Sequence, residues 1–341
     1  MIETAEKKKK VKEIFFHIIK ILIAGILIYW VVKDIKMDEL AVLPRSRLLF
    51  AWVTAFILVF CQTALSAFRW QLLVRAQGID LTFYRAFSLT FQGVFFSLCL
   101  PGGAVGGDVV KAACVVKETS GEKKVEAVTS IFMDRLVGLI ALFGLALFLI
   151  LIKIPAVLTM TKPIQATVWT LGIVCITGLS AAFFFLFHDI FLKISFIRKL
   201  LLLADRLGKG AFTRILASVD IYRKKWKTLF VTCIMGIVVI HPLLFLALYF
   251  IADILTGRLQ QIIPVFFAAA LGNVASCIPG TVGGLGARDK IMQILLETGN
   301  GLASSETAMI PILYTLGYVS CSLTGSLFFI SDSFLKKKKN K

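Results

Sequence analysis

This chain contains several apolar runs of about twenty residues, and each is long enough to cross a bilayer as a helix. The strong runs lie near residues 15–32, 48–67, 128–152, 166–187, 229–252 and 308–330. Hydrophobic residues make up 58% of the 341 residues, which exceeds the share of roughly half that is usual in soluble proteins. The sequence therefore predicts an all-α polytopic membrane protein with a single domain, and it excludes a soluble enzyme core.

The formal net charge of +18 comes in part from basic clusters that flank the apolar runs. Lysines occupy 7–10 and 336–339, and the 188–228 connection holds ten Lys or Arg against three Asp or Glu. Cytoplasmic loops of membrane proteins carry such an excess, which also attracts anionic lipids. We therefore expect a cell-membrane location, both termini in the cytoplasm, membrane lipids as partners, and no nucleic acid.

The sequence shows no pattern of an enzyme or a metal site. Its seven cysteines are scattered through apolar segments without a CxxC spacing, and its three histidines are far apart. Phosphate-binding loops, nucleophile elbows and zinc spacings are also missing. We expect a protein that is not an enzyme and that uses no metal, disulfide or cofactor.

Two shorter apolar segments, 86–100 and 262–278, each end in a Pro-Gly break of similar sequence. The first break reads Pro-Gly-Gly-Ala-Val-Gly-Gly-Asp over 101–108, and the second reads Pro-Gly-Thr-Val-Gly-Gly over 279–284. Broken helices at corresponding places in two halves of a membrane protein point to a transport site. Chance repetition, or a generic turn, is the alternative interpretation.

The loop charges favour re-entrant hairpins over full crossings for these two segments. If both turn back inside the membrane, the termini, 68–85 and 188–228 all lie on the cytoplasmic side. The chain then has about six full spans plus two oppositely oriented re-entrant helical hairpins, in an inverted-repeat architecture. Residues 1–187 hold the first half, 188–228 form a basic amphipathic cytoplasmic connector or a solvated loop, and 229–341 complete a second half whose first span is 166–187.

The breaks contain residues suited to binding an anion. Non-helical backbone at membrane depth survives only inside protein or beside a wet cavity, and glycine lets that backbone approach a ligand closely. Helices that restart after Gly107 and Gly286 would direct free N–H groups at a phosphate, whereas close packing through small residues is the alternative. Asp108 is interpreted either as an N-cap or as a carboxylate that pairs with Lys111 or a nearby arginine.

Charged doublets within the membrane segments supply further candidates. Neighbouring residues of a helix point about 100° apart, so Asp134 and Arg135 each need a separate partner or a ligand. Arg288-Asp289 is the analogous doublet after the second break, and the His-Pro pair at 241–242 is interpreted as a kink. Basic side chains from both halves would neutralise a lipid phosphate, and an internal ion-pair network is the alternative. The candidate substrate-binding residues are Arg69, Gly102, Gly103, Gly106, Gly107, Asp108, Lys111, Asp134, Arg135, Gly283, Gly284, Gly286, Arg288 and Asp289.

The order and spacing of these motifs resemble the lysylphosphatidylglycerol synthase transmembrane-region family of flippase-like integral membrane proteins. The resemblance spans nearly the whole chain and rests on four short motifs: Phe68-Arg69-Trp70, the glycine-rich 101–108, Met133-Asp134-Arg135-Leu136, and 279–286 with Arg288-Asp289. It implies a stand-alone member without the synthase domain. It also implies lipid translocation, with an aminoacyl-phospholipid or a polyprenyl-phosphate-linked intermediate as cargo and a separate lipid-synthesising enzyme as a partner.

These observations favour a lipid flippase-type transporter that moves an anionic or phosphate-bearing lipid between leaflets through the two hairpins. A transporter of a small soluble anion is one alternative, and a closed aqueous vestibule in place of a lateral opening would favour it. A non-transporting membrane scaffold for a lipid-modifying enzyme is the other. Dry, packed hairpin tips with every charge paired internally would favour the scaffold.

Overall fold

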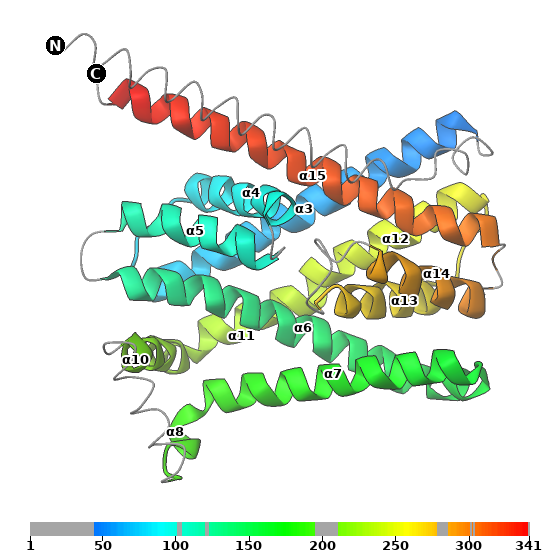
Figure 1. The fold of residues 1–341 in the computed structure, drawn as a ribbon, viewed down its shortest axis with the longest axis horizontal. Coiled ribbons are helices and arrows are strands. Elements are labelled where there is room, and N and C mark those ends of the chain that lie inside the picture. The colour runs from blue at the N-terminus through cyan, green and yellow to red at the C-terminus, as the bar shows by residue number, and fades with distance from the viewer. Residues whose placement is uncertain are drawn as a thin grey trace.

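The computed structural model describes residues 44–100, 104–119, 123–194, 211–277, 286–300, 302 and 304–339. These residues form helices joined by short connections, without a strand among them (Figure 1). The span predicted at 15–32, both Pro-Gly turns and residues 195–210 of the connector lie outside the described residues. The predicted all-helical class is therefore confirmed for the described part of the chain.

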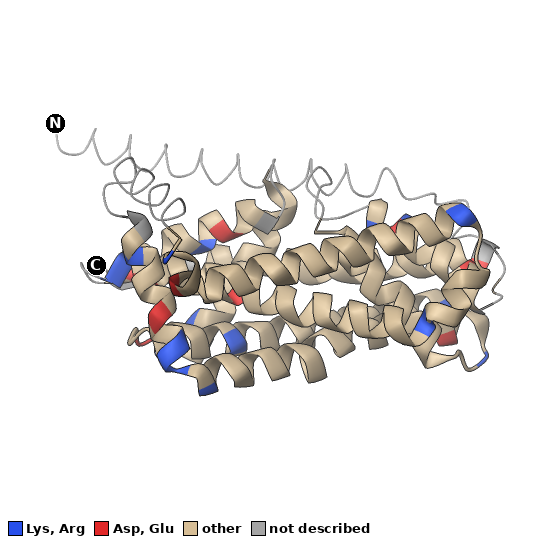
Figure 2. Cartoon of the chain, turned by 90° about the horizontal axis from the view of Figure 1, so that it is seen from below, with Lys and Arg blue, Asp and Glu red and all other residues tan. Residues whose placement is uncertain are grey.

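Five helical stretches in this part are long and apolar enough to cross a membrane. They are α3 (Arg45–Ala76), α6 (Lys124–Thr159), α7 (Lys162–Leu186), the continuous α11–η2–α12 stretch (Trp226–Thr256) and α15 (Ser304–Lys339). Apolar side chains such as Phe148, Ile173 and Phe230 are exposed on their outer faces, as lipid-facing residues are. Figure 2 shows charged residues gathered toward the two ends of the bundle, with few along its middle.

Each predicted break separates two short helices that pack against each other. Helix α4 (Phe83–Cys99) packs on α5 (Ala104–Glu118), and α13 (Ile262–Ala275) packs on α14 (Ala287–Asn300). Helix α4 ends before Pro101 because a residue that precedes proline disfavours the helical conformation, and Leu100 is extended. In Figure 1 the α4–α5 pair lies toward one end of the bundle and the α13–α14 pair toward the other.

The helix contacts of the first hairpin recur around the second. Helices α3 and α6 flank α4 and α5 in the first case, and α12 and α15 flank α13 and α14 in the second. Across the two sets, α4 contacts α15 and α13 contacts α6, while α3 and α12 pack together. Each hairpin is therefore held both by its own neighbours and by a long helix of the other set.

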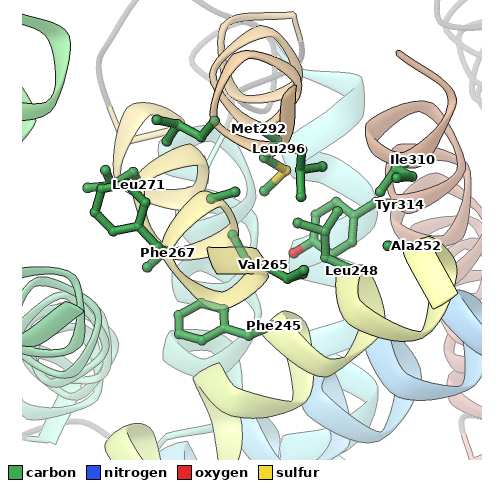
Figure 3. Close-up of a cluster of buried hydrophobic side chains, with 14 of the residues drawn as sticks. Phe245, Leu248, Ala252, Val265, Phe267, Leu271, Met292, Leu296, Ile310 and Tyr314 are labelled. Atoms are coloured by element: carbon green, nitrogen blue, oxygen red, sulfur yellow. The ribbon is translucent and has the colours of Figure 1, made fainter. Parts of the chain in front are cut away.

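The largest apolar core surrounds the second hairpin. Figure 3 shows side chains of α12, α13, α14 and α15 interdigitating, including Phe245, Leu248, Leu271, Met292 and Tyr314. All five are buried, so the hairpin is fixed to the spans by ordinary apolar packing. This packing positions the end of α13 at Ala275 against the interior of the bundle.

The start of α5 corrects one prediction. The helix begins at Ala104 and continues through both glycines at 106 and 107, so the helix does not restart after Gly107. Gly107 serves close packing and not a break, because a Cβ there would overlap the carbonyl oxygen of Gly93 on α4. Asp108 therefore lies inside the helix, and its interpretation as an N-cap is wrong.

The second restart agrees with the prediction. Helix α14 begins at Ala287, directly after Gly286, whose φ of 86° lies in the left-handed region that favours glycine. The backbone N–H of Gly286 donates a hydrogen bond to the Asp289 carboxylate at 3.3 Å. This bond is half of a capping box, so one role of Asp289 is to begin the helix.

The described part of the connector packs against the bundle. It contains α8 (His188–Phe191) and α10 (Ala211–Lys224), and α10 contacts α6, α7 and α11. The Tyr222 hydroxyl donates to the Leu73 carbonyl at 3.0 Å, and Lys225 Nζ donates to the Ala76 carbonyl at 2.7 Å. These bonds satisfy carbonyl groups at the end of α3 that have no helical partner.

Candidate functional site

A polar cavity of about 260 Å³ lies inside the bundle, between the two hairpins and the long helices. Its walls come from α3, α4, α5, α6, α12, α13 and α15. Five sequence-predicted residues line it, namely Arg69, Asp108, Lys111, Asp134 and Arg135. Charged residues at this depth are costly unless they face a cavity or a partner, and here they do both.

Arg69 and Asp134 form a buried ion pair between α3 and α6. Arg69 Nε donates to Asp134 Oδ1 at 2.8 Å, and its Nη2 donates to the backbone carbonyl of Asp134 at 3.2 Å. The two side chains are only 7% and 12% exposed, so water screens the pair little. Gly138 leaves room for this guanidinium, since a Cβ there would lie 3.2 Å from Nη2.

Arg135 and Asp108 form a second pair, between α6 and α5. Arg135 Nε donates to Asp108 Oδ2 at 2.7 Å and Nη2 donates to Oδ1 at 2.9 Å, which is bidentate geometry. Arg135 is 48% exposed and Asp108 23%, so this pair lies at an accessible edge of the cavity. The neighbours Asp134 and Arg135 thus have separate partners, as the helix geometry predicted.

Lys111 differs from the two arginines. Its residue is 5% exposed, and its Nζ lies 3.6 Å from the ring centroid of Trp70. Trp70 is fully buried and is held in place by its Nε1–H, which donates to Ser130 Oγ at 3.2 Å. Among the described residues, the Lys111 ammonium has no hydrogen-bond acceptor and no carboxylate within ion-pair distance. It is a buried cation stacked on an aromatic face.

Three further polar atoms of cavity-lining residues are buried without a hydrogen-bond partner in the described part of the chain. They are Arg69 Nη1, Thr90 Oγ1 and His241 Nδ1. Buried polar atoms are normally paired, so these three unpaired atoms mark the surroundings of the cavity as polar but incompletely hydrogen-bonded. Among the described residues, the group of this cavity without a polar partner that a ligand could meet is therefore the Lys111 ammonium.

Sequence reasoning missed part of this lining. Gln62, Thr63 and Ser66 share the wall with Arg69. Gln62 and Thr63 lie four and three residues before Ser66, which lies three before Arg69, so their positions on an apolar helix predict a shared polar face. Asn273 on α13 and His241 at the start of α12 complete the polar wall. Both could have been found from the sequence, because an imidazole or an amide inside an apolar segment is typical of a functional position.

His241 is positioned by a π-helical turn, η2 (Gly236–Ile240), at the predicted kink. Its backbone N–H donates to the carbonyl of Gly236, five residues back. Pro242 has no N–H, and its ring crowds the preceding turn, so the wider turn relieves the clash. The His241 ring then places Nε2 2.9 Å from the Gly138 carbonyl on α6.

Arg288 and Asp289 lie beside the cavity but do not line it. Arg288 Nε donates to Asp289 Oδ1 at 3.1 Å, and Arg288 and Asp289 both bond to the Thr315 hydroxyl. The Arg288 guanidinium also lies 5.7 Å from the ring of Tyr318, which does line the cavity. One aromatic ring therefore separates this cluster from the cavity, and this doublet pairs with itself, unlike the doublet on α6.

The predicted glycines contribute less to the cavity than the charged residues. Gly102, Gly103, Gly283 and Gly284 lie outside the described residues. Of the others, Gly107 contacts α4, Gly106 is half-buried on α5, and Gly286 precedes α14, and none of these three lines the cavity. Gly93 and Gly138 line it instead.

Comparison with known proteins agrees with this arrangement of apolar spans around a polar cavity. A family model described as the lysylphosphatidylglycerol synthase TM region matches residues 17–322, which is most of the chain. The chain belongs to this family. It is therefore a multi-pass membrane protein of a family with a lipid-related membrane function.

A curated relative is "UPF0104 membrane protein PH1989" of Pyrococcus horikoshii, which is 25% identical over 132 residues. That match covers 38% of this chain and 37% of the relative, so the chain matches little more than a third of the relative's length. No solved structure matches the chain.

Proposed function

We propose that this member of the family is a lipid flippase-type transporter that moves an anionic or phosphate-bearing lipid between the leaflets. The observation that carries the proposal is the cavity, whose described walls include helices long enough to span a membrane and hold three basic side chains against two carboxylates. Its volume of about 260 Å³ suits a head group, while acyl or polyprenyl chains stay in the bilayer. Arginine and lysine are the side chains that best neutralise phosphate.

The recurring helix contacts support a two-sided path. The α4–α5 and α13–α14 pairs lie toward opposite ends of the bundle (Figure 1). Long helices contact each pair in an equivalent way, α3 and α6 in the first case and α12 and α15 in the second. We infer that they are re-entrant hairpins of an inverted repeat that approach a midplane site from opposite leaflets. Both termini would then lie in the cytoplasm, on the side of the basic connector.

Purified protein reconstituted in liposomes tests the proposal. Fluorescently labelled phosphatidylglycerol is loaded in both leaflets, and an impermeant reductant bleaches the outer leaflet, so transport appears as bleaching of the inner pool. We expect protein-dependent bleaching that Arg135→Ala and Lys111→Ala reduce and that Arg45→Ala, at an exposed residue away from the cavity, leaves intact. Equal bleaching in protein-free liposomes, or full activity in both cavity variants, would refute it.

Transport of a small soluble anion is the second candidate, because the cavity is large enough for free phosphate without any chain. The same liposomes, loaded with radiolabelled phosphate, distinguish the two candidates. Release of phosphate without lipid movement would favour the soluble anion. Lipid movement without phosphate release would favour the flippase.

A further inference from the structure

Among the described residues that line the cavity, basic side chains outnumber carboxylates by one. Each of the two carboxylates is held by one arginine, in the pairs Arg69–Asp134 and Arg135–Asp108. With His241 counted as neutral, the Lys111 ammonium is the charge left over. The described lining of the cavity therefore presents a single uncompensated positive charge to a ligand that enters it.

The position of Lys111 makes this residual charge unfavourable without a counter-ion. The residue is 5% exposed, and the described residues offer its Nζ only the Trp70 ring at 3.6 Å. An aromatic face attracts a cation but replaces only part of the hydration that burial removes. Asp134 and Asp108 act on Lys111 electrostatically, yet each already accepts hydrogen bonds from an arginine.

The same carboxylates limit how much negative charge a ligand can bring. A ligand with one negative charge meets the ammonium of Lys111 in the cavity. Among the described residues that line the cavity, a second negative charge would find no further unpaired cation, and it would face two carboxylates across a small space. Like charges brought together in such a site cost considerable binding energy.

We propose that the cavity selects a head group with one negative charge on its phosphate, that is, a phosphodiester, over a phosphomonoester or a diphosphate. The inference deepens the proposed function, on which it rests, by naming the charge class of the lipid. Lys111, whose ammonium lies on the Trp70 ring, is the specificity-determining residue. The carboxylates of the two ion pairs limit the ligand to one negative charge. This class includes glycerophospholipids and sugars joined to a polyprenyl chain through a single phosphate.

Binding in detergent micelles tests this without requiring transport. Short-chain phosphatidylglycerol, a diester, and short-chain phosphatidic acid, a monoester with the same chains, are titrated separately, and binding is read by calorimetry. We expect the wild type to bind the diester about tenfold more tightly, from the like-charge repulsion that the monoester meets. Lys111→Met should abolish this binding, and Lys111→Arg should retain the preference.

Asp108→Asn is the decisive variant because it leaves two uncompensated positive charges. We expect the ratio of diester to monoester affinity to fall by about tenfold or to invert. Glu118→Gln removes a carboxylate from the same helix outside the cavity and should leave the ratio unchanged. Equal affinities in the wild type, or an unchanged ratio in Asp108→Asn, would overturn the inference. A retained preference in a protein that moves no lipid in liposomes would support the inference and refute the flippase.

Discussion

The pair formed by Arg69 and Asp134 should behave as a buried structural clamp between α3 and α6. Both side chains are almost fully buried, so replacing either alone leaves the other without its hydrogen-bonded ion-pair partner in the core. Removal of one partner of such a pair typically costs about 3–5 kcal/mol, whereas replacing both with apolar residues of similar size is close to neutral. We therefore expect Arg69→Met and Asp134→Leu each to destabilise the protein by about 3–5 kcal/mol, and the double variant to recover most of that loss.

Thiol labelling during thermal unfolding in detergent measures the stability of the wild type, the two single variants and the double variant. Cys175 and Cys321 are fully buried and become reactive only when the bundle opens, so the remaining cysteines are first replaced by alanine. The matched control is the exposed pair Arg258–Glu306, 3.5 Å apart with side chains 60% and 26% exposed, whose removal should cost about 0–1 kcal/mol. Additive losses in the buried pair, or single losses no larger than the control, would refute the clamp.

Three other expectations concern packing and backbone. Gly107→Ala should separate α4 from α5 and destabilise the protein by about 1–3 kcal/mol in the same assay, because its Cβ overlaps Gly93. Gly144→Ala, where a Cβ meets nothing within 4 Å, is the control, and equal effects of the two would contradict this explanation. Gly286→Ala should cost about 1–2 kcal/mol from its positive φ, and an unchanged melting temperature would argue against that strain. Tyr222→Phe should cost about 1–3 kcal/mol by leaving a buried carbonyl unpaired, and protection of amides at the end of α3 from hydrogen exchange should fall with it.

The sequence was sufficient to predict five of the six expected spans and the two pairs of short helices on either side of the breaks. A helix in a bilayer must satisfy its own backbone and expose apolar side chains, so length and composition alone indicate where α3, α6, α7, α12 and α15 lie. The end of the first short helix followed from Pro101 for an equally local reason. The start of α5 did not follow from the local sequence, because glycines at 106 and 107 are typical of a break, whereas Gly107 here lies within the helix and lets it pack closely on Gly93.

The partners of the charged residues could not be predicted from local sequence. Helix geometry showed that Asp134 and Arg135 need separate partners, and they have them. Which residues they meet depends on how α3 and α5 pack on α6, and Arg69 is 65 positions away from Asp134 in the chain. That Lys111 has no carboxylate partner among the described residues also depends on helix packing, because none of the described helices around it brings a free carboxylate within ion-pair distance.

The π-helical turn η2 has a consequence for comparing this chain with its relatives. Such a turn holds one residue more than an α-helical turn, so it is equivalent to a one-residue insertion within a span. Each residue of a helix advances the direction by about 100°, and loss of that residue would rotate every following side chain of α12 by this amount. His241 would then no longer meet Gly138, and its neighbour in sequence would take over that direction. Alignments of relatives that lack the turn should therefore open a single gap within 236–240, or they will equate residues that face different sides of the helix.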